Sequence, residues 1–161
     1  MSARVQYILI IGALLLLSQL SLSVSGFIIG MQDLSYDNEA ILAATSLAQS
    51  VLHNVTAKNF DEVTTTKKLL SADSLTYPET LGPDPGETYA TFDDVDDYNG
   101  YSDSLATDRL GGFEFAVTVN YATLVGAPSP TRTFLKAVSI TVGGRYLTQN
   151  ENIVLNTIVS Y

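Results

Sequence analysis

The densest group of side chains with metal-binding chemistry is an acidic block in the second half of the chain. Its five aspartates and one asparagine are Asp93, Asp94, Asp96, Asp97, Asn99 and Asp103. Calcium takes about six to eight oxygen ligands from residues of these types. The spacing does not fit an EF-hand, because placing Gly100 at the sixth loop position puts Val95 at the first. The block predicts either a calcium site or a solvated acidic loop in which Asp and Asn form turns.

Catalytic chemistry has few candidates in this sequence. His53 is the only histidine, and its place at the end of a predicted helix is typical of a surface residue that complements the helix dipole. No cysteine is present, and no second histidine is available to activate a serine. Neighbouring loop aspartates do not suggest the facing pair that a glycosidase needs. The sequence therefore favours a protein that is not an enzyme. Asn54-Val55-Thr56 is a glycosylation sequon.

Charge and composition exclude further classes of function. The net charge is −9, and Arg4 is the only charged residue before Asp33, so the rest of the chain carries seven basic against seventeen acidic residues. Such a negative field repels phosphate backbones, which argues against nucleic-acid binding. Without cysteine, the domain must be held together by packing, by oligomerisation or by a metal ion.

The element that must position these residues begins with an uncharged apolar run from Val5 to Gln32. As a helix, this run is about 40 Å long, which exceeds the hydrocarbon core of a bilayer at roughly 30 Å. Arg4 precedes the run, and acidic residues follow it from Asp33. Because basic flanks stay in the cytoplasm, we expect a single-pass anchor over residues 1–32 with the C-terminal domain outside the cytoplasmic membrane.

A cleaved secretory signal peptide is the alternative interpretation of the same run. Ser23 and Ser25 place small residues three and one before Gly26, which a signal peptidase accepts. The stretch Val5 to Leu22 is long for the apolar region of a signal peptide, and apolar residues resume at Phe27. We therefore expect the helix to be retained.

A second helical pattern follows the apolar run and is predicted to end near residue 58. Apolar residues from Ala40 to Leu52 recur at intervals of three and four, as on an amphipathic helix over residues 33–58. It either continues the first helix or begins anew at a cap formed by Ser35 or Asp37. Gly26 and Gly30 favour a bend and form a small-xxx-small pair that lets helices approach closely in lipid.

The remaining chain predicts a loop region followed by antiparallel strands. Residues 59–112 are rich in Asp, Thr, Ser, Gly and Pro and predict an irregular acidic loop region. From Phe113 to Tyr121, apolar and polar residues alternate as in a strand with one buried face. Further strands are expected at Thr133 to Val142, with Lys136 as an exception in its apolar row, and then at Arg145 to Thr148 and Ile153 to Val159. Gly143-Gly144 predicts a tight hairpin turn.

These elements together predict an α+β fold. The sheet over residues 113–161 has three or four antiparallel strands and one apolar face. The helical stretch from Ala40 to Leu52 is the expected cover for that face. The tyrosines are consistent with subunit contacts, and core packing and scatter over the surface explain them equally well. They are Tyr77, Tyr89, Tyr98, Tyr101, Tyr121, Tyr146 and Tyr161.

Four segments, in this order, resemble the type IV pilin and pseudopilin superfamily, including minor subunits of mannose-sensitive haemagglutinin pili. They are Ala44 to Leu52, Phe60-Asp61-Glu62-Val63, Phe92 to Tyr101 with its Asp-Asp-Val-Asp-Asp-Tyr run, and Lys136 to Val142. The resemblance implies a subunit of an envelope-anchored filament, extracellular or periplasmic, whose stem helices form the core of the fibre. It also implies a calcium site in the loop region, because some pseudopilins carry one.

The sequence departs from that superfamily at its N-terminus. The superfamily has a short basic leader that ends in Gly, followed by an apolar segment with a Glu at the fifth mature position. Here the Gly-Phe pair Gly26-Phe27 comes after most of the apolar run, and no acidic residue lies inside it. The resemblance therefore does not carry over the processing step or the charge-paired assembly step.

The sequence leads to one principal hypothesis and one alternative. The principal hypothesis is a structural, non-enzymatic filament subunit that assembles with like or related subunits by bundling apolar helices. The alternative is a single-pass membrane module whose external domain binds a ligand or calcium. A cleaved, secreted protein with its N-terminus at Gly26 is a third interpretation.

Overall fold

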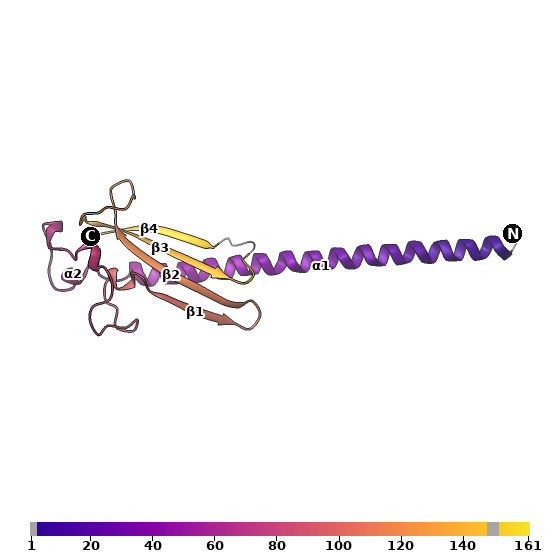
Figure 1. Ribbon diagram of the computed structural model, residues 1–161, viewed down its shortest axis with the longest axis horizontal. Helices are drawn as coiled ribbons and strands as arrows, with labels where there is room; N and C mark the ends of the chain where they lie inside the picture. The colour runs from indigo at the N-terminus through magenta and orange to yellow at the C-terminus, as the bar shows by residue number, and fades with distance from the viewer. Residues whose placement is uncertain (1–2, 148–151) are drawn as a thin grey trace. The chain divides into compact units, whose positions relative to one another are not determined.

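The computed structural model describes residues 3–147 and 152–161. The chain divides into two compact units, residues 1–39 and 40–161. Its helices and strands, labelled in Figure 1, are α1 (Ala3–Thr56), α2 (Glu62–Thr66), the short 3-10 helices η1 (Ala72–Ser74), η2 (Pro78–Thr80) and η3 (Asp96–Tyr98), and the strands β1 (Ser102–Thr107), β2 (Gly111–Tyr121), β3 (Leu135–Gly144) and β4 (Ile153–Ser160).

Helix α1 is unbroken from Ala3 to Thr56. The alternative of a separate helix start at Ser35 or Asp37 is wrong, and the helix is not broken at Gly26 or Gly30. A glycine inside a helix lowers helix stability by about 1 kcal/mol relative to alanine, and the helix-forming residues on either side offset this loss. The expected C-terminal end at residue 58 is two residues too late.

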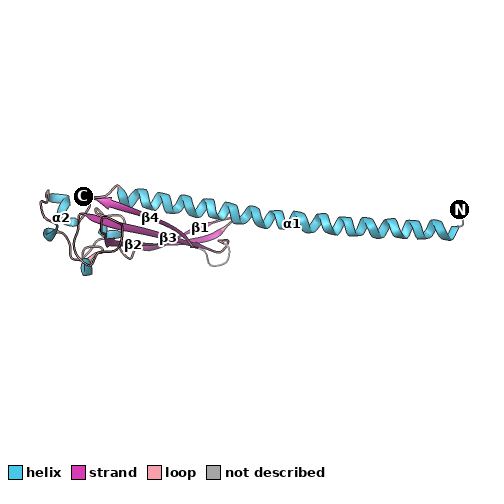
Figure 2. Cartoon of the chain, turned by 90° about the horizontal axis from the view of Figure 1, so that it is seen from above, coloured by secondary structure: helices cyan, strands magenta, loops and turns pink. Residues whose placement is uncertain are grey.

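The four strands form an antiparallel sheet in the order β1-β2-β3-β4, which confirms the predicted α+β arrangement. Within the second unit, the end of α1 lies along one face of this sheet (Figure 2). Its buried residues follow helical spacing and include small side chains that let the helix approach the strands closely; they are Ala40, Ala44, Ala48, Val51 and Val55.

Strand β2 confirms the predicted alternation, with burial at every second residue. Its inward row, Phe113, Phe115, Val117, Val119 and Tyr121, packs in the core. In β3 the buried row is Lys136, Val138, Ile140 and Val142, so the charged exception points inward with the apolar residues.

Strand β1 lies in the region predicted to be irregular, and the sheet therefore begins at Ser102 and not at residue 113. All six residues of β1 are exposed or half-exposed, since this strand forms the edge of the sheet. A strand without a buried face has no need of alternating apolar residues, so its sequence lacks the signal that identifies β2. The rest of residues 59–112 contains α2 and three 3-10 helices.

Gly143 and Gly144 belong to β3, which corrects the predicted hairpin turn at this pair. Gly144 lies opposite Phe113 in the ladder, and a Cβ built on Gly144 would come within 2.6 Å of the Phe113 ring. Position 144 therefore requires a glycine, because the Phe113 ring leaves no space for a side chain. Residues Arg145 to Leu147 form a turn and a bend, where a strand was expected, and Thr148 lies outside the described residues.

Candidate functional site

The acidic block folds as a tight turn around η3. Asp94 Oδ1 accepts hydrogen bonds from the backbone N–H groups of Asp96 (2.8 Å) and Asp97 (3.1 Å). Asp97 Oδ2 accepts in turn from the N–H groups of Asp93 (2.9 Å) and Asp94 (3.2 Å). Asp94, Asp96 and Asp97 are each at most 3% exposed, because Val95 and Tyr98 anchor the turn in the core. Much of the block is therefore buried, which the solvated-loop interpretation did not anticipate.

Three of the six predicted calcium ligands have other roles in the structure. Asp96 pairs with the buried Lys136, and the other two are Asn99 and Asp103. The Asn99 side chain donates to the Leu81 carbonyl (2.9 Å) and accepts from the Val119 N–H (2.9 Å), so it joins the loop to β2. Asp103 lies on β1, where its carboxylate accepts hydrogen bonds from the Tyr101 hydroxyl and the Ser104 N–H. Both side chains contribute to the local structure of this region.

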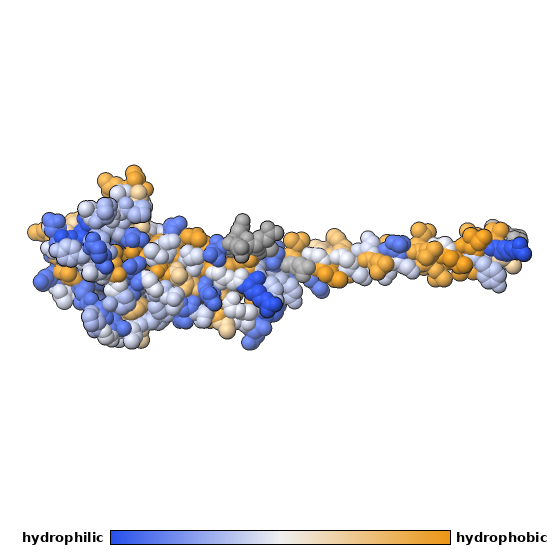
Figure 3. Space-filling model, in the orientation of Figure 1, coloured by the Kyte–Doolittle hydropathy of each residue, from blue (hydrophilic) through white to orange (hydrophobic). Residues whose placement is uncertain are grey.

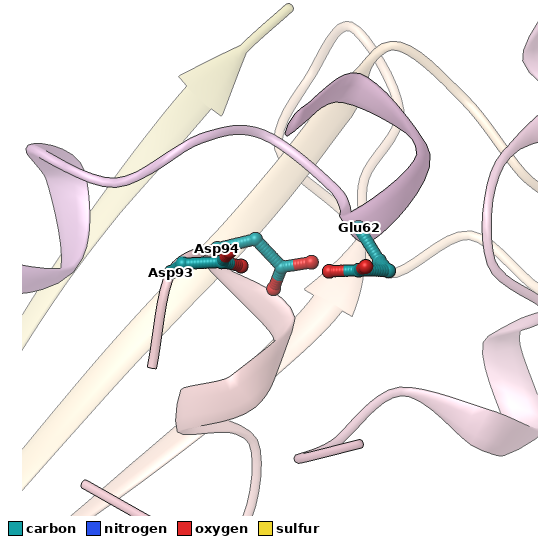
Figure 4. Close-up of side chains that lie close together, drawn as sticks. All are labelled: Glu62, Asp93 and Asp94. Atoms are coloured by element: carbon teal, nitrogen blue, oxygen red, sulfur yellow. The ribbon is translucent and has the colours of Figure 1, made fainter. Parts of the chain in front are cut away.

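Carboxylates from three parts of the chain gather at the surface beside this turn. Glu62 at the start of α2 comes together with Asp93 and Asp94, and their carboxylates point toward one another in Figure 4. A second group joins Glu87 with Asp93 and Asp97. Within each group, one oxygen per residue lies within 4.8 Å of the others. Glu62 and Glu87 were not among the residues predicted from the sequence.

The close carboxylates change one another's proton affinity. Partial burial and the charge of Asp93 raise the pKa of Glu62. For Glu87, a hydrogen bond from the Asp84 N–H lowers the pKa, but the hydrogen bond to Asp97 and the nearby charges outweigh it, so the pKa is raised. Burial and the charge of Asp96 raise the pKa of Asp94 to about 9. A divalent cation would relieve this repulsion, and carboxylate oxygens are the donors that calcium prefers.

The acidic groups are chemically suited to a hard cation, with Glu62, Glu87, Asp93, Asp94 and Asp97 as the candidate ligands. Exposed acidic groups are also common without a cation. Asp94 and Asp97 already accept backbone hydrogen bonds that stabilise the turn. Calcium binding therefore stays a prediction.

The second feature of this region is a fully buried lysine. Lys136 is 0% exposed, and its Nζ donates to three oxygens: Asp96 Oδ1 at 2.6 Å, Phe60 O at 2.6 Å and Asp61 Oδ2 at 3.0 Å. The nitrogen also lies 4.6 Å from the centre of the Phe60 ring and 5.3 Å from that of Tyr121. We call Lys136, Asp61, Asp96, Phe60 and Tyr121 the Lys136 centre.

Asp61 is the most extensively hydrogen-bonded carboxylate of the Lys136 centre. It caps α2, accepting from the Val63 N–H, while Thr64 completes a capping box with the Asp61 N–H. The backbone N–H and the hydroxyl of Thr76 also donate to it, at 3.1 to 3.3 Å. The Tyr121 hydroxyl donates to Oδ2 at 3.1 Å. Several neutral donors thus surround a carboxylate from which water is excluded.

Asp96 has a different environment from Asp61. Burial raises its pKa, and the Lys136 charge together with a hydrogen bond from Asp94 opposes that rise without cancelling it. Because the raised pKa of Asp94 keeps that carboxyl protonated at neutral pH, Asp94 is the donor in this hydrogen bond. The two carboxyl groups therefore share one proton beside the buried lysine.

The Lys136 centre was missed at the level of sequence, although one signal pointed to it. Lys136 interrupts an apolar row, and a charge on a buried face needs a partner. Its partners lie 40 and 75 residues away along the chain, in segments without regular periodicity, so the sequence did not identify them.

His53 lies in the last turn of α1, as predicted, and its side chain is exposed. Among the tyrosines, Tyr98 and Tyr121 are buried in the core, while Tyr77 and Tyr161 are exposed. A comparison of the chain with protein families, curated proteins and solved structures found no match.

Proposed function

We propose that this protein is a structural subunit of a membrane-anchored, pilin-like filament that assembles by bundling its apolar N-terminal helices. The observation that carries the proposal is the exposure of the first unit. From Val5 to Met31, the large apolar side chains of α1 are between 43% and 73% exposed, and Figure 3 shows apolar residues along this part of the helix. Contiguous apolar surface of this extent is typical of membrane or subunit contacts.

The same segment is suited to crossing a membrane. Helix α1 contains an 18-residue window of mean hydropathy 2.2, none of it buried within the described chain. A signal sequence passes the same test, so retention of the segment is part of the proposal. Lipid covers an apolar helix in a monomer, and neighbouring stems would cover it in a fibre.

One face of this helix is suited to close contact with another helix. At about 100° per residue, Gly12, Gln19, Ser23, Gly26 and Gly30 fall on the same side. Small residues let helix backbones approach in lipid, and a polar side chain such as Gln19 gains a hydrogen bond there. Among the residues that the structure describes, no atom lies within 4 Å of a Cβ built on any of the three glycines, so a side chain added there meets no other part of them.

Site-directed cross-linking tests the proposal, because the chain contains no cysteine of its own. Ser23→Cys and Ser21→Cys form a matched pair on opposite faces of α1. In oxidised native membranes, we expect more disulfide-linked dimer from Ser23→Cys than from Ser21→Cys. The double variant should form ladders longer than a dimer, since each copy then carries two reactive sites.

Two results would refute the filament proposal. One is a mature N-terminus at Gly26 by mass spectrometry, because the stem would then be absent. The other is a single monomer band for the single and double cysteine variants, with the stem intact in membranes. That outcome would favour the alternative, a single-pass module that binds a ligand or calcium.

A further inference from the structure

We propose that Lys136 and Asp61 form an intramolecular amide bond, with Asp96 carrying the protons, so that the Lys136 centre is a self-processing cross-link site. The proposal rests on the placement of three groups. A lysine nitrogen with no solvent exposure lies 3.0 Å from one carboxylate oxygen and 2.6 Å from another. Condensation of an amine with a carboxylic acid needs these groups in contact, a proton carrier and the exclusion of water.

The lysine is placed to act as the nucleophile. Its three N–H groups point to Asp96, Asp61 and the Phe60 carbonyl. The Phe60 and Tyr121 rings line the same space, and the nitrogen has no contact with solvent. An amide nitrogen keeps one proton, and the Phe60 carbonyl at 2.6 Å is placed to accept it.

Asp61 is better placed than Asp96 to be the electrophile. An acyl substitution develops negative charge on the carboxyl oxygen, and preorganised donors stabilise that charge. The Val63 N–H at 3.3 Å and the Thr76 hydroxyl at 3.2 Å donate to Asp61 Oδ1. The Thr76 N–H lies between the two oxygens, 3.3 Å from Oδ1 and 3.1 Å from Oδ2. Asp96 Oδ1 instead lies 2.6 Å from the lysine nitrogen, closer than the Asp61 carboxylate at 3.0 Å, which suits a carrier of protons.

The reaction balances without any further reagent. Asp96 takes a proton from the Lys136 ammonium and passes it to Asp61, which leaves a neutral amine beside a carboxylic acid. The amine attacks Asp61 Cγ, forming the C–N bond, and Asp96 takes a second proton from the nitrogen. Asp96 returns this proton to the departing hydroxyl, the C–O bond breaks, and one water leaves. Asp96 ends as it began, as a carboxylate.

The bond would join the start of β3 to the segment between α1 and α2. A chain without cysteine has no disulfide to serve this purpose. Asp61 and Lys136 are 75 residues apart, and a cross-link between distant positions restricts the unfolded chain strongly. Such a bond would suit a domain that must resist unfolding outside the cytoplasm.

Mass spectrometry of the purified, denatured full chain tests the proposal. We expect a mass lower than that of the sequence by one water, about 18 Da. After trypsin, the peptide over residues 59–67 should be joined to the peptide over residues 133–145, with no cleavage after the acylated Lys136. Asp96→Asn should restore the full mass, whereas Asp108→Asn, at an exposed aspartate outside the Lys136 centre and the acidic groups, should keep the loss.

The wild-type spectrum decides the question even if Asp96→Asn does not fold. A folded wild-type chain with the full sequence mass would overturn the proposal. An amide that fragmentation maps to Asp96 would overturn the assignment of Asp61 as the electrophile. Retention of the water loss at Lys136 and Asp61 in a folded Asp96→Asn chain would overturn the role of Asp96.

Discussion

Asp94→Asn should stabilise the second unit at alkaline pH. Asp94 is 1% exposed, and burial beside the charge of Asp96 raises its pKa to about 9. The folded chain therefore keeps a proton at pH 8 that the unfolded chain releases above about pH 4. The contribution of Asp94 to the free energy of unfolding is therefore fully present below about pH 4 and is lost as the pH rises toward 9.

The structure sets the size of this effect. When only the folded state binds a proton, the free energy of unfolding falls by up to about 1.4 kcal/mol for each unit that the pH rises. Between pH 5 and pH 8 the limit is about 4 kcal/mol, and we expect about 2 kcal/mol because Asp94 shares its proton with Asp96. Asn keeps the shape, accepts from the same two N–H groups and donates to Asp96 without titrating. The stability gap between variant and wild type should therefore grow from near zero at pH 5 to about 2 kcal/mol at pH 8.

Urea unfolding of the full chain in a non-ionic detergent measures this gap, with tyrosine fluorescence as the probe because the chain has no tryptophan. Asp94→Ala is the control, since it leaves the N–H groups of Asp96 and Asp97 without an acceptor. We expect it to cost about 1–3 kcal/mol at both pH values.

The reasoning is refuted if Asp94→Asn is no more stable than wild type at pH 8 in the presence of a chelator. Asp94 would then be ionised in the folded chain. Repeating the measurement with calcium tests the metal prediction separately. A calcium ligand at Asp94 would make calcium stabilise the wild type and have less effect on Asp94→Asn.

Three further substitutions test the packing of the second unit, each by the same unfolding measurement. Tyr121→Phe removes a hydroxyl whose single proton lies between two acceptors, Asp61 Oδ2 at 3.1 Å and the Thr76 carbonyl at 2.7 Å, and should cost about 1–2 kcal/mol. No loss of stability would show that this hydrogen bonding contributes nothing. Ala44 is 0% exposed where α1 packs on the sheet, so Ala44→Leu adds bulk that does not fit and should lower the free energy of unfolding by about 1–3 kcal/mol. Ser46→Leu, on the exposed side of α1, should have little effect. Equal effects of the two substitutions would argue against this packing. Gly144→Ala places a Cβ 2.6 Å from the Phe113 ring and should lower the free energy of unfolding by about 1–3 kcal/mol. Gly112→Ala is the control, because its Cβ meets no described atom within 4 Å. An unchanged stability of Gly144→Ala would contradict the close approach.

Local patterns in the sequence were sufficient to predict the main elements. The apolar run and the spacing of Ala40, Ala44 and Ala48 predict the helix, and the alternation from Phe113 to Tyr121 predicts β2. Both patterns arise because each element buries one side, so apolar residues recur along the sequence with the period of the helix or of the strand. Strand β1 has no buried side and was therefore missed.

Glycines show why local patterns can mislead. The pair Gly143-Gly144 has the composition of a hairpin turn, yet both residues extend β3. The reason is the Phe113 ring on the neighbouring strand, which leaves no room for a side chain at Gly144. A steric requirement imposed by a residue 31 positions away cannot be recognised in the dipeptide itself.

The sequence by itself determined that the chain has an exposed apolar helix, an α+β domain and an acidic block, because each is a property of neighbouring residues. Only the tertiary structure decided what the acidic residues contact. It separated Asp96, which faces the buried Lys136, from Asp93, which is exposed beside Glu62. The composition of the block is the same for both residues. Their roles differ because folding brings Asp96 into contact with Lys136 of β3 and places Asp93 beside Glu62 of α2.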